Sequence, residues 1–130
     1  MALDIQDRFA IEDLLRRGCY NADYNPPDSM REVYTPDAVF EVPAMDISCQ
    51  GIDNLVAFFT QSRAGAPSAR HVINNVVIEG DGDTAKSSAY LQVLRTDEGE
   101  IRIVSVGRYV DALTRTAAGW RIAHRTVVIG

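Results

Sequence analysis

Four long strand-like segments in the second half of the chain limit its fold more than any other feature. Each is rich in β-branched and aromatic residues, and short turn-forming clusters separate them. The segments are residues 70–79 (RHVINNVVIE), 84–95 (TAKSSAYLQVLR), 101–115 (IRIVSVGRYVDALTR) and 120–129 (WRIAHRTVVI). Because strands joined by such short turns pair with their neighbours in sequence, this half predicts a four-stranded antiparallel meander.

An amphipathic helix is predicted over residues 4–22, near the start of the chain. Its apolar residues recur at spacings of three and four, the period of a helix that buries one face. They are Ile5, Phe9, Ile11, Leu14, Leu15, Cys19 and Ala22. Asp4 can cap the start of this helix, and Pro26 and Pro27 stop it.

Two further helices and two short strands are predicted before the meander. Ser29 and Glu32 have the spacing of a capping box, which predicts a short helix that ends at Pro36. Strands are predicted at residues 38–44 (AVFEVPA) and near residues 46–51 (DISCQG). The third helix follows, and its apolar residues are Ile52, Leu55, Val56, Phe58 and Phe59.

These elements predict a single domain, residues 1–130, of the α+β class. A chain of 130 residues can bury a substantial core without disulfides or metal ions. Helices that precede a run of strands, rather than alternating with them, are typical of α+β folds. We therefore predict three N-terminal helices packed on a long, curved, mainly antiparallel sheet, with a pocket between the first helix and the sheet.

The charge balance argues against nucleic acid as a partner. With 18 acidic and 13 basic residues, the formal net charge is −5, whereas binding to nucleic acid needs a basic face. No apolar run approaches the roughly 20 residues of a membrane span. The first residues lack the basic start and apolar core of a signal peptide, which predicts a cytoplasmic protein. We expect a small neutral or apolar molecule as the partner.

The sequence offers no recognisable site for a metal ion or an organic cofactor. Cys19 and Cys49 belong to no CxxC pair or Cys/His cluster, and we expect both to be buried, reduced thiols. The chain also lacks a Gly-rich phosphate loop and a serine nucleophile elbow. The chemistry left open is acid–base catalysis without a metal or cofactor.

His71 lies near the start of the first long strand and is one of two histidines in the chain. Strict alternation along the strand would place His71, Ile73, Asn75 and Val77 on one face. Both faces become apolar toward the end of the strand, which predicts that it is covered on both sides. His71 and Asn75 would then line a cavity or lie at the end of the sheet. In the alternative, His71 is a structural histidine bonded to a backbone carbonyl.

Asp23 ends the first predicted helix, where the negative end of the helix dipole makes a carboxylate unfavourable. A residue that is unfavourable in its local structure is often kept because it has a functional role. If Asp23 points to His71, it sets the imidazole tautomer and strengthens the ring as a base. Tyr20, three residues earlier on the same helical face, could supply a phenolic hydrogen bond. In the alternative, Asp23 faces solvent in a turn.

The second histidine, His124, is predicted to have a packing role. In strict alternation it shares one face of its strand with Trp120, Ile122 and Thr126. Arg125 would point to the opposite face as a surface or interface charge, with anion binding as the alternative.

The chain resembles the nuclear transport factor 2-like superfamily, and in particular its polyketide-cyclase-like (SnoaL-like) and scytalone-dehydratase-like branch. The resemblance rests on FAIEDLLRRGCYNAD (9–23), YTPDAVFEV (34–42), GIDNLVAFF (51–59), HVINNVVIEGD (71–81) and GWRIAHRTVV (119–128). It implies a cone-shaped, cystatin-like fold.

In scytalone dehydratase and similar enzymes, an Asp that ends the first helix pairs with a His that opens the strand after the third helix. Asp23 and His71 occupy those positions, and His71 with Asn75 matches the H-x-x-x-N pattern of this group. Val42 stands where ketosteroid isomerases carry their catalytic Asp, which argues against that reaction.

Residues and resemblance together predict a cofactor-independent lyase, a dehydratase of a small apolar or cyclic carbonyl substrate. His71 would remove the proton α to the carbonyl, Asp23 would orient His71, and Tyr20 and Asn75 would bind the substrate. The alternatives are a non-catalytic ligand-binding or assembly domain, and a cyclase or epoxide-hydrolase-like enzyme in the same pocket. Apolar residues on the outer face of the short open sheet predict a homo-oligomer, a dimer or a trimer.

Overall fold

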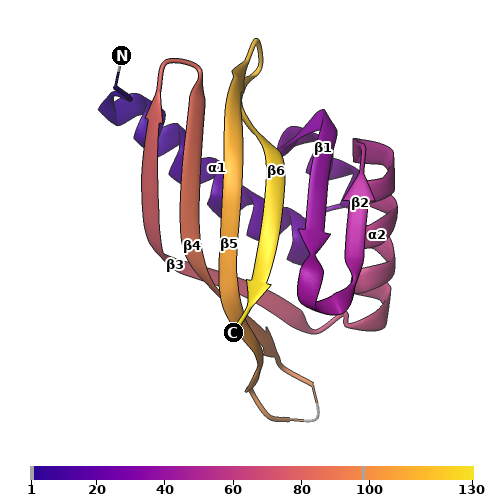
Figure 1. Ribbon diagram of the computed structural model, residues 1–130. Helices are drawn as coiled ribbons and strands as arrows, with labels where there is room; N and C mark the ends of the chain where they lie inside the picture. Colours follow the sequence, from indigo (N-terminus) through magenta and orange to yellow (C-terminus); the bar gives the residue numbers. More distant parts are fainter. Residues whose placement is uncertain (1, 98) are drawn as a thin grey trace.

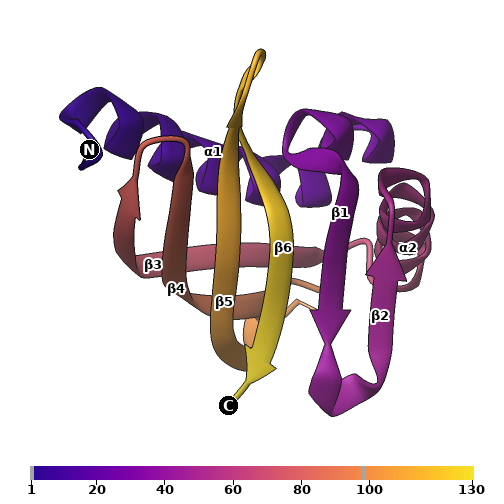
Figure 2. The same cartoon turned by 45° about the horizontal axis from the view of Figure 1, so that its top comes forward.

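In the computed structural model, which describes residues 2–97 and 99–130, one curved sheet carries the helices on a single face (Figures 1 and 2). The elements are α1 (Ile5–Asp23), the 3-10 helix η1 (Pro27–Glu32), β1 (Tyr34–Val42), the 3-10 helix η2 (Pro43–Met45), β2 (Ile47–Gln50), α2 (Ile52–Gly65), β3 (Ala69–Asp81), β4 (Thr84–Arg95), β5 (Arg102–Thr116) and β6 (Gly119–Ile129). The predicted α+β class is confirmed.

The sheet has the strand order β2-β1-β6-β5-β4-β3. Strands β3 to β6 form the predicted antiparallel meander. Strand β1 pairs with β6 in parallel and carries β2 as an antiparallel edge strand. Since parallel neighbours need a long connection, the path from β1 to β6 runs through α2 and the first three strands of the meander.

Helix α1 begins at the predicted cap, but its first turns are more exposed than the periodicity suggests. The Asp4 side chain accepts a hydrogen bond from the backbone N–H of Asp7, and the Asp7 side chain accepts one from the backbone N–H of Asp4. Ile11 is fully buried, whereas Ile5 and Phe9 are 68% and 64% exposed. The predicted apolar face is therefore wider than the stripe that the sheet covers, and only the later turns contribute to the core.

The short second helix differs from the prediction in its type and its cap. It is a 3-10 helix that starts at Pro27, and no side chain caps it. The predicted capping box between Ser29 and Glu32 is therefore wrong. The Ser29 backbone carbonyl instead accepts a hydrogen bond from the Asn21 side chain at 3.1 Å, which attaches η1 to α1.

The hydrophobic core lies between the helices and the concave face of the sheet. Its largest fully buried side chains come from α1, α2, η1 and β6 and from the η1–β1 connection, and they are Ile11, Leu15, Met30, Val33, Leu55 and Ile122. Among the described residues, no helix has the length and apolar character needed to cross a membrane.

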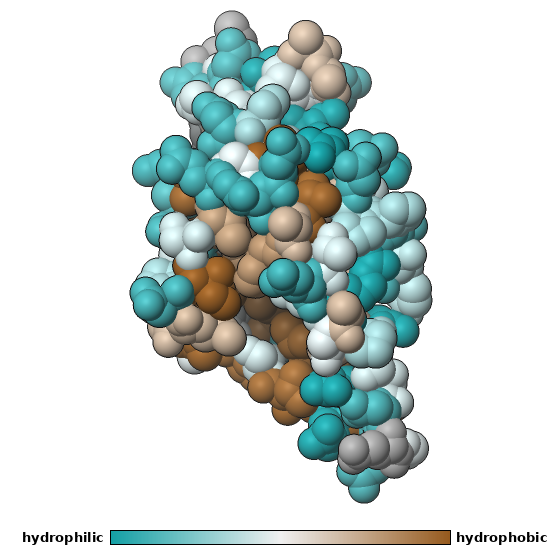
Figure 3. All heavy atoms as spheres, turned by 90° about the vertical axis from the view of Figure 1, so that its right-hand side faces the viewer, coloured by the Kyte–Doolittle hydropathy of each residue, from teal (hydrophilic) through white to brown (hydrophobic). Residues whose placement is uncertain are grey.

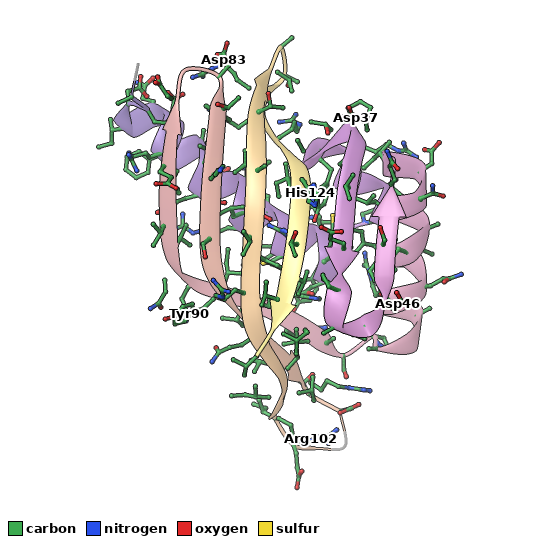
Figure 4. All side chains as sticks on the ribbon, viewed as in Figure 1. Asp37, Asp46, Asp83, Tyr90, Arg102 and His124 are labelled. Atoms are coloured by element: carbon green, nitrogen blue, oxygen red, sulfur yellow. The ribbon has the colours of Figure 1, made fainter. Side chains whose placement is uncertain are left out.

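The opposite, outer face of the sheet carries large apolar side chains in solvent. Val77, Tyr90, Val106 and Val110 are 39–66% exposed, and cross-strand pairing places them on the face that the helices leave open. Figure 4, viewed from this side, labels Tyr90. Several large apolar side chains exposed on one sheet face favour an interface with another chain.

We therefore expect the protein to be a homo-oligomer, with a sedimentation mass that is a multiple of the 14.3 kDa chain mass. Val110→Lys would place a charge within the outer face and should yield folded monomers. Ile101→Lys is the matched control, because Ile101 is 77% exposed in the β4–β5 connection. A wild-type monomer at micromolar concentration would contradict the prediction. The prediction would also be contradicted if Ile101→Lys dissociated the oligomer and Val110→Lys did not.

Candidate functional site

Asp23 and His71 meet where the end of α1 packs on the start of β3. The Oδ1 atom of Asp23 lies 2.6 Å from Nδ1 of His71, and Oδ2 accepts the backbone N–H of His71 at 2.8 Å. The Asp23 side chain is only 7% exposed and that of His71 is 27% exposed. A carboxylate held at two points can only accept from Nδ1–H. The neutral ring therefore carries its proton on Nδ1, which leaves Nε2 free to accept one.

The unfavourable position of Asp23 is compensated by a residue from another helix. The last turn of α1 contains no basic residue, but Arg63 of α2 donates to the backbone carbonyls of Asn21, at 3.1 Å, and of Asn25. A cation that bonds the last carbonyls of a helix offsets the negative end of its dipole. Sequence reasoning missed Arg63, because its spacing from Asp23 carries no local signal.

An apolar hollow, the inner cavity, lies between α2 and the concave face of the sheet and borders the Asp23–His71 pair. Its volume is about 370 Å³, and its walls are mainly apolar, with Phe58 and Phe59 of α2 facing sheet residues. Figure 3 shows apolar side chains gathered around a hollow on the side of α2 and β2. A cavity of this size and lining suits a small apolar molecule.

A second depression, the outer groove, lies on the other side of the same pair, between α1 and β3. It has a volume of about 420 Å³, and its polar lining includes Tyr20 and Arg70. Tyr20 is 65% exposed and has no hydrogen bond to Asp23 or His71 within the described part of the chain. Asp23 and His71 are the residues that border both hollows.

Asn75 lines neither hollow, because a β-bulge changes the side-chain alternation of β3. The register with β4 shifts between Asn74 and Val77, and Asn75 has a φ of +55°, a left-handed conformation that Asn tolerates better than most residues. An extra residue in a strand turns the following side chains to the other face. The expectation that His71, Asn75 and Val77 share one face is therefore wrong. The prediction that β3 is covered on both faces is also wrong, since Val77 is 66% exposed.

A second bulge, in β6, reverses the predicted roles of His124 and Arg125. Consecutive β5 residues pair with Ile122 and His124, so Ala123 is the extra residue and the next side chain turns inward. Arg125 is accordingly buried, and its Nε and Nη2 each donate to the Asp111 carboxylate at 2.7 Å. The predicted surface position of Arg125 is wrong. Burial alone would lower the pKa of Arg125, but the Asp111 charge raises it well above the usual value.

His124 lies at the outer face, where β6 pairs with β1 (Figure 4). Its side chain is 45% exposed, and its Nε2 lies 2.7 Å from Oε1 of Glu41. That hydrogen bond lowers the pKa of Glu41. The predicted packing role of His124 in the core is therefore wrong. His124 borders neither hollow.

Cys19 and Cys49 are both free thiols. Burial raises the pKa of Cys19 to about 11 and raises that of Cys49 as well. Cys19 borders the outer groove, but a thiol with so high a pKa is a poor nucleophile at neutral pH. In residues 2–97 and 99–130, no cluster of three or more His, Cys, Asp or Glu side chains could hold a metal ion.

With this fold and site described, comparison with known proteins identifies the family. The SnoaL-like domain model matches residues 4–126, and the chain belongs to that family. It is 30% identical over 129 residues to the uncharacterized protein Rv2910c of Mycobacterium tuberculosis, a match that covers 94% of this chain and 84% of the relative.

Three solved structures from Novosphingobium aromaticivorans have the same fold. An NTF2-like protein with a cystatin-like fold is 23% identical, with a TM-score of 0.90 over 96% of this chain and 82% of that one. A proposed aromatic ring hydroxylase is 30% identical, with a TM-score of 0.85 over 98% and 91%. A proposed scytalone dehydratase is 18% identical, with a TM-score of 0.82 over 97% and 85%. The nuclear transport factor 2-like, cystatin-like fold is thereby confirmed.

Proposed function

We propose that this protein is a cofactor-independent lyase that dehydrates a small apolar or cyclic β-hydroxy carbonyl compound. The observation that carries the proposal is the Asp23–His71 hydrogen bond of 2.6 Å at the wall of the apolar inner cavity. A histidine whose second nitrogen is held by a buried carboxylate is a general base of defined tautomer.

In the proposed reaction, Nε2 of His71 takes the proton α to the substrate carbonyl. The electron pair of that C–H bond forms the C=C bond, and the β C–O bond breaks. The leaving hydroxyl takes the proton from Nε2 of the His71 imidazolium and departs as water, so that His71 is neutral again at the end of the cycle. Asp23 stabilises the imidazolium that forms between the two proton transfers.

A donor for the substrate carbonyl is available in the inner cavity from Tyr109. This residue borders the cavity, and burial raises the pKa of its hydroxyl, which therefore stays protonated and able to donate. A donor aimed at the developing enolate oxygen stabilises the charge that proton removal creates. Tyr109 is proposed as this donor in place of Tyr20 and Asn75, because neither of these two residues lines the inner cavity.

The likeness to a proposed scytalone dehydratase agrees with this reaction. The likeness to the beta subunit of a proposed aromatic-ring-hydroxylating dioxygenase from Novosphingobium aromaticivorans favours a role as a subunit or ligand holder instead. The two differ in what happens to a bound carbonyl compound. A dehydratase converts it, and a holder returns it unchanged.

The test is a panel of small cyclic β-hydroxy ketones incubated with the protein in D₂O. We expect an absorbing enone to form, together with deuterium at the α carbon of the remaining substrate. His71→Gln should abolish both signals. His124→Gln is the matched control and should retain them, because His124 lies on the outer face of the sheet. Binding of panel members without enone or exchange would show a ligand holder and overturn the proposal.

A further inference from the structure

Arg70 is a cation that is held in place but not neutralised. Its Nε donates to the Tyr24 hydroxyl at 2.6 Å, and its Nη1 donates to the carbonyls of Pro67 and Ala69 at 3.1 and 2.8 Å. Its guanidinium carbon lies 4.5 Å from the centre of the Tyr24 ring. All of these partners are uncharged. Within the described residues, no carboxylate forms a salt bridge with Arg70, and its Nη2 has no hydrogen-bond partner in the protein.

The other charged groups of the outer groove already have partners. Arg16 pairs with Glu12 at 3.0 Å, and both carboxylate oxygens of Asp23 accept bonds from His71. Arg70 is therefore the arginine of the groove's described lining that has no carboxylate partner, in a chain whose net charge is −5. A guanidinium oriented by fixed neutral acceptors, with the N–H groups of its Nη2 unbonded, can donate a charge-assisted hydrogen bond to a carboxylate.

We propose that the outer groove binds the carboxylate of an acidic substrate through Arg70. Tyr20 and Tyr24 line the groove beside this cation, and their ring centres are 6.2 Å apart. They offer apolar surface to the part of the ligand next to its carboxylate, with hydroxyl groups available for hydrogen bonds. The ligand class is an organic monoacid with an apolar or aromatic body.

The position of Arg70 connects this subsite with the proposed reaction. Arg70 directly precedes His71 in β3, and both line the groove. An acid anchored at Arg70 has its body against the Asp23–His71 pair, the boundary between the groove and the inner cavity. The role of the bound acid as substrate rests on the proposed function, whereas the binding of a carboxylate does not.

Benzoate and its neutral analogue benzamide test the subsite directly. Each is titrated into ¹⁵N-labelled protein, and the signals of the Arg70 side chain and of the His71 backbone amide are followed. We expect benzoate to bind at least about tenfold more tightly than benzamide and to shift both signals. Arg70→Gln should remove this preference. Arg121→Gln should keep it, because Arg121 has the same charge but donates to the Trp120 carbonyl at 2.8 Å outside the groove.

Equal affinities of the wild-type protein for the two probes, or no saturable binding of benzoate, would overturn the subsite. These outcomes need no variant, so they stand even if Arg70→Gln fails to fold. Retained preference in a folded Arg70→Gln would overturn it as well. If the protein also dehydrates a matched pair of acidic and neutral ketones, Arg70→Gln should raise KM for the acid alone. An absence of turnover with benzoate binding intact would reject the proposed function and leave the carboxylate site standing.

Discussion

Asp23→Asn is expected to lower turnover of any accepted substrate by about 10²–10⁴-fold, while the free energy of unfolding changes by less than about 1 kcal/mol. The small effect on stability follows from the geometry. The amide oxygen can accept the backbone N–H of His71, and the amide nitrogen can donate to Nδ1, so both contacts of the carboxylate have a replacement.

The large effect on turnover follows from the tautomer that this arrangement requires. If Nδ1 accepts a hydrogen bond from Asn, the proton of the neutral ring moves to Nε2. The nitrogen that should take the substrate proton then carries one already. The imidazolium also loses the negative charge that stabilises it during the reaction. Shape and packing are retained, but the base is blocked.

Two measurements on the same samples check this prediction. Turnover and denaturant-induced unfolding of Asp23→Asn are compared with those of Asp13→Asn, a control on the exposed side of α1 with a 58% exposed side chain. The ¹⁵N chemical shifts of the His71 ring at neutral pH report which nitrogen carries the proton. Clear destabilisation of Asp23→Asn with activity retained would make Asp23 a structural residue, and the acid–base mechanism would have to be abandoned.

Asp111→Ala is expected to destabilise the protein by about 3–5 kcal/mol, the usual result of removing one partner from a buried ion pair. The Arg125 side chain is 4% exposed and that of Asp111 is 1% exposed. Without Asp111, the guanidinium keeps the Tyr109 ring, 3.7 Å away, and the Tyr34 hydroxyl at 3.3 Å. Neither of these partners carries a negative charge, because burial raises the pKa of Tyr34 to about 12 and raises that of Tyr109 as well.

Replacement of both partners separates two effects on the free energy of unfolding: the net contribution of the ion pair, and the destabilisation caused by one charge left buried without its partner. The double variant Asp111→Leu/Arg125→Met should be much more stable than Asp111→Ala, because it leaves no buried charge. Asp83→Ala is the control for a surface pair and should have little effect, since the Asp83 side chain is 79% exposed. Denaturant unfolding at one protein concentration measures all three. A loss for Asp111→Ala no larger than that for Asp83→Ala would show that Arg125 finds solvent when its partner is removed.

The elements and the pairing of Asp23 with His71 could be predicted because their signals are local or depend on chain order. Turn-forming clusters between long segments rich in β-branched residues are sufficient to predict an antiparallel meander. Asp4 lies directly before an amphipathic period and caps it. For Asp23 and His71, residue patterns alone left solvent-facing and structural alternatives open, and the order of the motifs that resemble the scytalone-dehydratase-like branch implied their pairing.

The face to which each strand residue points was decided by the tertiary structure. Alternation is a rule of period two, and one bulge reverses it for every later residue. The bulge near Asn75 turned that residue away from the site, and the bulge at Ala123 brought Arg125 into the core and left His124 outside. The local sequence alone does not fix either position, although Asn75 is a residue type that tolerates the left-handed conformation found at the first bulge.

The long-range partners were likewise decided by packing. Arg63 meets the end of α1 across 42 positions of sequence, and Asp111 meets Arg125 across the β5–β6 pair. Such contacts depend on where two elements cross, and an arginine at one point of the sequence has no preferred carboxylate or carbonyl until the fold supplies it. Sequence pattern determined the strands and the helices, and together with the family resemblance it predicted the Asp23–His71 pair. The surroundings of that pair, its two hollows and the cation beside each of them, arose only when the elements were packed together.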